Sequence, residues 1–128
     1  MELHLSILDG VGDRYDTPYF TNLKRYSQKP VGTFHALPVA RGKSVFRSKW
    51  IRDMGHFYGT NLFLAESSAT TGGLDSLLEP TGNIKRAQAM AARAFGADRA
   101  YFVTNGTSTS NKIVLQALLA PGDIVLID

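Results

Sequence analysis

The chain has 128 residues, with 14 lysines and arginines against 11 aspartates and glutamates, and 44% of its residues are apolar. This length allows one domain at most, and the apolar content excludes wholesale disorder. Because the chain has no cysteine, disulfides, thiolate metal sites and a cysteine nucleophile are excluded. No apolar run approaches the roughly 18 residues of a membrane span.

The first ten residues, MELHLSILDG, contain neither a basic segment nor a small-residue cleavage site. We therefore expect no signal peptide and a cytoplasmic location. The three histidines, His4, His35 and His56, lie far apart in the sequence, so a histidine metal site is not expected. His35 and His56 have aromatic or loop neighbours, which favours a structural role for both.

The segment from Thr17 to Arg52 carries eight basic residues and no acidic one, while the rest of the chain is acidic on balance. Aromatic residues are interleaved with these charges, as in many nucleic-acid-binding surfaces. No recognised nucleic-acid motif accompanies them. A solvated or phosphate-facing segment is therefore favoured over a nucleic-acid interface.

Residues 1 to about 80 contain many glycines and prolines and have weak hydrophobic periodicity. Short helices are predicted around Tyr19–Tyr26 and Ser44–Asp53, and ordered loop elsewhere in this half. The second half is more regular. A helix is predicted to begin at Ile84, capped by Thr81 or Asn83, and to stop at Gly96 in a left-handed conformation.

Residues 99–103 (RAYFV) predict a short strand, and residues 109–119 predict a second helix. A turn at residues 121–123 then leads into residues 124–128 (IVLID), an apolar strand of the kind buried on both faces of a sheet. Helix, strand, loop, helix, strand is the order of a parallel α/β sheet. Two strands cannot complete such a sheet, and about eighty residues of irregular chain seldom accompany one such unit. We therefore expect the start of an α/β domain that belongs to a larger protein.

The segment Thr104-Asn105-Gly106-Thr107-Ser108-Thr109-Ser110-Asn111 lies between the first predicted strand and the second predicted helix. Open α/β sheets bind ligands at this position. The first turn of a helix offers unpaired N–H groups, Gly106 allows close approach, and the hydroxyls of Thr107, Ser108 and Thr109 add donors. The pattern predicts a site for a phosphate monoester, although helix capping by one of these hydroxyls is the simpler alternative. It is neither a Walker loop nor a dinucleotide fingerprint.

Other polar residues favour structural roles. Lys112 lies one turn into the predicted second helix and is expected on the surface. The pairs Glu66/Asp75 and Asp75/Glu79 invite a general acid–base interpretation. Nothing in the sequence places either pair on one face, so capping or ion pairing is favoured.

Three segments together resemble the bacterial Orn/Lys/Arg decarboxylases: GGLDSLLEPTG at residues 72–82, IKRAQAMAARAFGADRAYFVTNGTSTSNKIV from Ile84 to Val114, and PGDIVLID at the end of the chain. The segment TFHALPVARG adds a weaker match. The resemblance covers about residues 30–128, with its most specific part from Leu74 to Val114. It implies residues 30–128 as the amino-terminal portion of a fold-type I pyridoxal-phosphate (PLP) domain, preceded by a loop-rich segment, 1–29, of no recognised relationship.

The resemblance implies that Gly106, Thr107, Ser108 and Thr109 grip the phosphate of PLP. It extends weakly to Leu78–Gly82, which would lie near the active site and a subunit contact. The family's Schiff-base lysine lies in a Ser-x-His-Lys motif that this sequence lacks, and none of the six lysines has a comparable context. The chain alone would then supply no catalytic residue and no turnover.

The function implied is a PLP-dependent decarboxylase of a basic amino acid (arginine, lysine or ornithine), at least a homodimer when complete. One alternative is another fold-type I PLP enzyme, an aldolase or an aminotransferase. A second alternative is a non-catalytic phosphate- or nucleic-acid-binding module that uses the basic segment. Steep weakening of binding by salt would support that module.

Overall fold

The computed structural model describes residues 2–34, 36–67, 70 and 72–126, and within them the secondary structure is entirely helical. His35, Ile127 and Asp128 lie outside the described residues. The elements in chain order are α1 (Glu2–Arg14), α2 (Pro18–Gln28), the 3-10 turn η1 (Ala40–Gly42), α3 (Lys43–Arg47), α4 (Arg52–Tyr58), α5 (Thr60–Leu64), α6 (Asn83–Phe95) and α7 (Thr107–Leu118).

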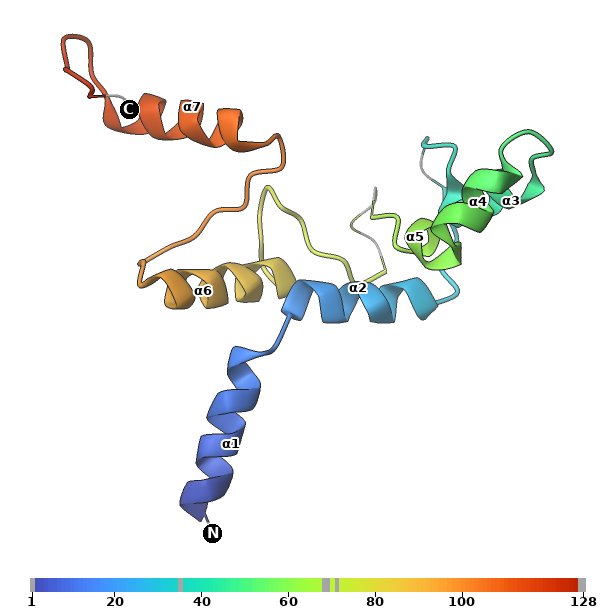
Figure 1. The fold of residues 1–128 in the computed structure, drawn as a ribbon, viewed down its shortest axis with the longest axis horizontal. Coiled ribbons are helices and arrows are strands. Elements are labelled where there is room, and N and C mark those ends of the chain that lie inside the picture. Colours follow the sequence, from blue (N-terminus) through green and yellow to red (C-terminus); the bar gives the residue numbers. More distant parts are fainter. Residues whose placement is uncertain (1, 35, 68–69, 71, 127–128) are drawn as a thin grey trace.

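The helices form an open arrangement (Figure 1). Helix α2 packs against α6, while η1, α3, α4 and α5 form a second group at the carboxyl end of α2. Helix α1 projects away from the other helices, and α7 lies apart at the end of a long connection from α6. The two packed groups therefore share α2 as their common element.

The core is small. The buried apolar side chains are those of Tyr26, Val45, Phe63, Ile84 and Ala92. In the second group, the rings of Phe46 and Phe63 meet edge to face with centroids 5.8 Å apart. Helix α4 approaches Phe46 through Gly55, where an added Cβ would lie only 2.7 Å from the ring. A glycine at position 55 thus permits the packing of α4 on α3.

Several predicted helices are confirmed, with changed boundaries. Helix α2 extends the predicted Tyr19–Tyr26 helix at both ends, and α6 matches the helix predicted from Ile84, including a left-handed Gly96 with φ 64°. The predicted helix at Ser44–Asp53 is divided into α3 and α4. The hydroxyl of Ser48 accepts hydrogen bonds from the N–H groups of Trp50 and Ile51, which turns the chain between the two helices.

The prediction of loop for the first residues is wrong, because α1 is a helix of 13 residues. Leu3, Ile7 and Val11 are spaced at four-residue intervals and give the helix an apolar stripe. Glu2 in the first turn and Arg14 in the last turn complement the helix dipole. Gly10 and Gly12, which indicated loop, are accommodated inside this helix.

The predicted strands are also corrected. Residues 99–103 and the described residues 124–126 have no strand structure. Figure 1 shows the chain between α6 and α7 as a long connection with bends and no strand. A strand of a parallel sheet needs neighbouring strands to satisfy its N–H and C=O groups. The described residues provide no such neighbour, so the parallel α/β sheet expected from the sequence is not formed in this part of the chain.

Candidate functional site

The predicted phosphate-binding segment forms a tight turn into α7. Gly106 precedes the helix with φ 80° and ψ 175°, a conformation that is essentially restricted to glycine. The N–H groups of Thr109 and Ser110 both donate to the carbonyl of Gly106, at 3.1 and 3.3 Å. The predicted amino end of a helix is therefore present after Gly106, but the strand predicted before it is not.

The donors of this turn face open space. Gly106, Thr107 and Ser108 are exposed, and no atom lies within 4 Å of the position that a Cβ on Gly106 would occupy. The first N–H groups of α7, those of Thr107 and Ser108, have no acceptor within the helix. The N-cap residue of α7 is Gly106, which has no side chain to accept a hydrogen bond from these N–H groups. Backbone amides and hydroxyls of this kind match the oxygens of a phosphate monoester.

Thr109 has a different role from its two neighbours. Its side chain is half-buried, and its hydroxyl donates to the carbonyl of Asn105 at 3.1 Å. That proton is therefore used within the turn. Among the four predicted residues, Thr109 holds the shape of the turn while Thr107 and Ser108 present their groups outward.

Asp75 accepts hydrogen bonds from backbone N–H groups of the loop that precedes α6. Its Oδ1 accepts hydrogen bonds from the N–H groups of Ser76 (3.0 Å) and Thr81 (3.1 Å). Its Oδ2 accepts from those of Gly82 and Ile84, each at 2.9 Å. Asp75 thereby caps α6 from outside the helix. The prediction that Thr81 or Asn83 caps this helix is wrong. The structural interpretation of this carboxylate is confirmed.

The environment of Asp75 favours its ionised form. Burial raises the pKa of this carboxyl, but hydrogen bonds from the backbone at Thr81, Gly82, Ile84 and Lys85 outweigh burial and lower the pKa below its ordinary value. The negative charge also lies at the positive end of α6.

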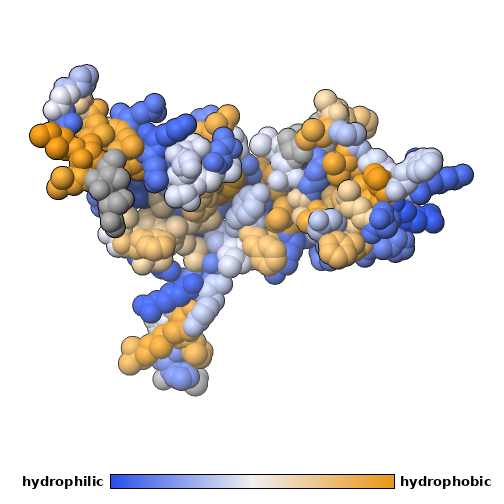
Figure 2. All heavy atoms as spheres, turned by 45° about the horizontal axis from the view of Figure 1, so that its top comes forward, coloured by the Kyte–Doolittle hydropathy of each residue, from blue (hydrophilic) through white to orange (hydrophobic). Residues whose placement is uncertain are grey.

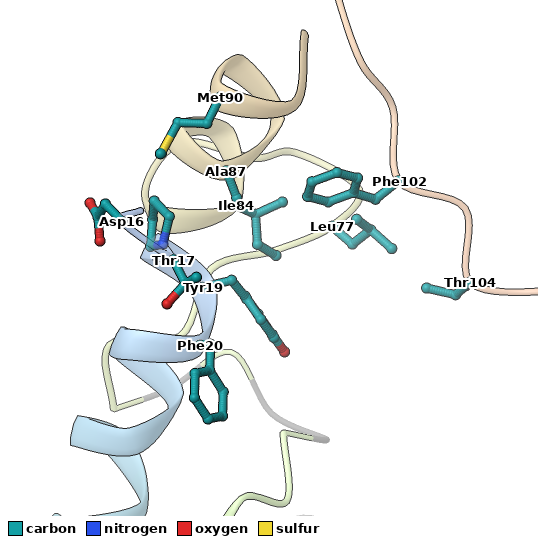
Figure 3. Close-up of a pocket in the computed structure, with 11 residues that line it drawn as sticks. Asp16, Thr17, Tyr19, Phe20, Leu77, Ile84, Ala87, Met90, Phe102 and Thr104 are labelled. Atoms are coloured by element: carbon teal, nitrogen blue, oxygen red, sulfur yellow. The ribbon is translucent and has the colours of Figure 1, made fainter. Parts of the chain in front are cut away.

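An apolar pocket of about 530 Å³ lies beside this loop. In Figure 3 the side chain of Phe102 points toward Ile84 and Leu77, and Thr104 follows on the same stretch of chain. Helix α2 contributes Tyr19 and Phe20 to the opposite wall. The pocket therefore joins the segment held by Asp75 to the segment that leads into Gly106.

The remaining predicted residues are not brought together into a second site. One oxygen of Glu66 accepts from the N–H of Arg41 at 3.2 Å, whereas Glu79 is exposed in the loop held by Asp75. Lys112 is exposed on α7, as predicted, and His56 is exposed on α4. Both oxygens of Asp75, the residue common to the two carboxylate pairs, accept backbone hydrogen bonds.

Part of the basic segment is engaged within the fold. Lys29 donates to the carbonyl of Gly72 at 3.1 Å, and Lys24 lies over the ring of Phe20. Arg41 is buried, stacks over the ring of Tyr26 and donates to the carbonyl of Ser27 at 2.8 Å. These contacts assign three of the eight basic residues to structural roles.

Sequence reasoning did not identify Arg41 as a structural residue. Its guanidinium binds carbonyls in the last turn of α2, 14 and 15 residues earlier in the chain. Ala40 and Arg41 both adopt left-handed conformations, with φ 46° and 53°. Pro38 and Gly42 signal a turn in the sequence, but neither indicates that Arg41 is buried against α2.

Comparison with known proteins adds independent information. The family described as Orn/Lys/Arg decarboxylase, major domain, matches residues 17–128. The constitutive ornithine decarboxylase of Escherichia coli K12 is 38% identical over 111 residues, which are 87% of this chain and 16% of that protein. The lysine decarboxylase LdcA of Pseudomonas aeruginosa is 37% identical over 112 residues, 87% of this chain and 15% of that protein.

A third relative, the biodegradative arginine decarboxylase of Escherichia coli K12, is 34% identical over 111 residues, again 87% of this chain and 15% of the relative. The chain thus spans less than one fifth of the length of these proteins. None of the helices in the described part of the chain is long and apolar enough to cross a membrane. Because the match extends over residues 17–128, including the turn at Gly106 and the loop held by Asp75, the chain belongs to the Orn/Lys/Arg decarboxylase family and carries part of its major domain.

Proposed function

We propose that the complete protein is a PLP-dependent decarboxylase of a basic amino acid, and that Gly106, Thr107 and Ser108 bind the cofactor phosphate. The observation that carries this proposal is the exposed turn at Gly106, within the segment that the family match covers. Thr109 supports the turn through its bond to Asn105. The donor set suits a dianionic phosphate monoester, because exposed amides and hydroxyls lie together at the start of α7.

The role of this chain is to hold the cofactor. When bound, PLP supplies an electron sink for the carbanion that loss of CO2 leaves on the substrate. The N–H groups and hydroxyls of Thr107 and Ser108 would fix the phosphate and thereby orient the ring. No lysine of this chain lies in a Ser-x-His-Lys motif, so we assign catalysis to residues outside it.

The names of the relatives indicate the class of substrate. Their names specify ornithine, lysine and arginine decarboxylases, so we propose one of these three amino acids. We also propose a homodimer or larger homo-oligomer, because the exposed apolar side chains on α1 and α7 leave surface for subunit contacts.

The test uses the complete protein. PLP binding and the release of CO2 from arginine, lysine and ornithine would be measured for the native protein and for Thr107→Val/Ser108→Ala. We expect CO2 release from at least one substrate, and weaker PLP binding in the double variant. Release of an aldehyde without CO2 would instead support a different PLP reaction, and the absence of PLP binding would overturn the proposal.

A further inference from the structure

The loop held by Asp75 has a second consequence, which concerns the position of the phosphate-binding turn. Asp75 fixes Ile84 directly, through the N–H of that residue at 2.9 Å. It also closes the loop that carries Leu77, through the N–H groups of Ser76 and Thr81. One carboxylate therefore sets the relative positions of Leu77 and Ile84.

Phe102 lines the same apolar pocket as these two side chains and is 41% exposed. In Figure 3 its ring points toward Ile84 and Leu77. The stretch between α6 and α7 has no regular secondary structure, so its path depends on side-chain packing and not on a backbone hydrogen-bond ladder. Thr104, which lines the same pocket, is followed two residues later by Gly106.

We propose that Asp75 is a positioning residue for the phosphate-binding turn. It acts by fixing Leu77 and Ile84, which form the packing surface for Phe102. This inference rests on the proposed function, because it concerns the same turn. The backbone hydrogen bonds of Asp75 all lie within residues 76–85 and not at the turn. Asp75 keeps this packing surface rigid. A rigid turn loses less conformational entropy when a ligand binds.

The first experiment compares Asp75→Asn with Glu79→Gln in the complete protein. Glu79 is an exposed carboxylate in the same loop, so the control removes the same charge without removing the hydrogen bonds. The readouts are the dissociation constants of PLP and of pyridoxal, which lacks the phosphate. We expect Asp75→Asn to weaken PLP binding about tenfold, or about 1.4 kcal/mol, with pyridoxal binding unchanged. Equal loss for both compounds, or no loss, would overturn the proposal.

A second measurement needs no cofactor. Hydrogen exchange of the backbone at residues 100–110 would be followed in the native protein, in Asp75→Asn and in Phe102→Leu, which keeps an apolar side chain. We expect faster exchange in both variants and native exchange in Glu79→Gln. Native exchange in Phe102→Leu would overturn the proposal even if Asp75→Asn failed to fold.

The two proposals fail in different ways. If Thr107→Val/Ser108→Ala leaves PLP binding unchanged, the proposed phosphate site is wrong, whatever the exchange data show. If that double variant weakens PLP binding but Asp75→Asn does not, the site stands and the positioning role of Asp75 is wrong. A double-mutant cycle between Asp75→Asn and Phe102→Leu tests whether the two residues act together. The loss of PLP binding free energy in the double variant should be smaller than the sum of the losses in the single variants.

Discussion

Gly106 has a backbone conformation, φ 80° and ψ 175°, that residues other than glycine rarely adopt. We therefore predict that Gly106→Ala lowers the free energy of unfolding by about 1–3 kcal/mol and weakens PLP binding by the complete protein. The space beside Gly106 is open, so the cost arises from the backbone and not from a steric clash. Urea unfolding and PLP titration would measure the two effects.

Gly10 provides the matched control for this substitution. It lies inside α1, and an added Cβ would meet no atom within 4 Å. Because glycine is about 1 kcal/mol less favourable than alanine in a helix, Gly10→Ala should increase helix content, as measured by circular dichroism. A loss of stability in both glycine variants would contradict the conformational argument for Gly106.

Asp75 makes stability depend on pH. Its pKa is lowered in the folded chain, so the stabilisation is fully present above the ordinary carboxyl pKa of about 3.9. It is lost as the pH falls through the lower pKa of the folded state. We predict that Asp75→Asn lowers the free energy of unfolding at pH 7 by about 0.5–2 kcal/mol, the range for loss of a helix cap. The difference from the native chain should shrink below about pH 4. A difference that stays constant from pH 7 to pH 3 would argue against this role.

At the scale of the elements, α2 depends on Arg41 for its carboxyl end. The guanidinium Nη2 donates to the carbonyls of Tyr26 and Ser27, and its Cζ atom lies 4.8 Å from the centre of the Tyr26 ring. A lysine ammonium lacks the planar group that stacks on the ring and cannot hold its donor in the same position. We predict that Arg41→Lys lowers the free energy of unfolding by about 1–3 kcal/mol, because buried carbonyls lose their partner.

The exposed Lys49 offers a comparison for Arg41, since it is a nearby basic residue outside the helices. Lys49→Ala should change the free energy of unfolding by less than about 0.5 kcal/mol. Chemical denaturation of both variants would check the difference. Equal effects would show that the contacts of Arg41 add nothing to stability beyond those of an exposed basic residue.

At the scale of the whole molecule, apolar surface remains uncovered. Figure 2 shows apolar side chains on the protruding α1 and around the end formed by α7 and the residues that follow it. Leu3, Leu118, Ile124 and Leu126 are each at least three-quarters exposed. Among the described residues, no side chain is less than 2% exposed, so the packing that normally makes unfolding cooperative is limited.

We predict that the 128-residue chain by itself binds a hydrophobic dye such as ANS and melts over a broad temperature range. Both properties follow from the exposed apolar surface and the small core. The complete protein provides the comparison, and it should show weaker dye binding per residue and a sharper transition. A sharp, cooperative melt of the 128-residue chain without dye binding would contradict this view of its packing.

The sequence by itself determined the local features of this protein. The helix at α6 and its stop at Gly96 follow from helix-forming residues and a terminal glycine, and the turn at Gly106 follows from a glycine before a run of hydroxyl residues. Sequence reasoning failed for α1, because Gly10 and Gly12 indicated loop although they lie inside the helix.

Only the tertiary structure decided which distant groups meet. Asp75 was visible as a capping candidate, but its four backbone donors lie one to nine residues away, and Arg41 reaches α2 across 14 residues or more. Residues 99–103 have the composition of a strand, yet they form none in the described chain. The physical reason is that helix hydrogen bonds close within four residues, whereas a strand, a remote cap or a buried guanidinium needs partners that the local sequence does not specify.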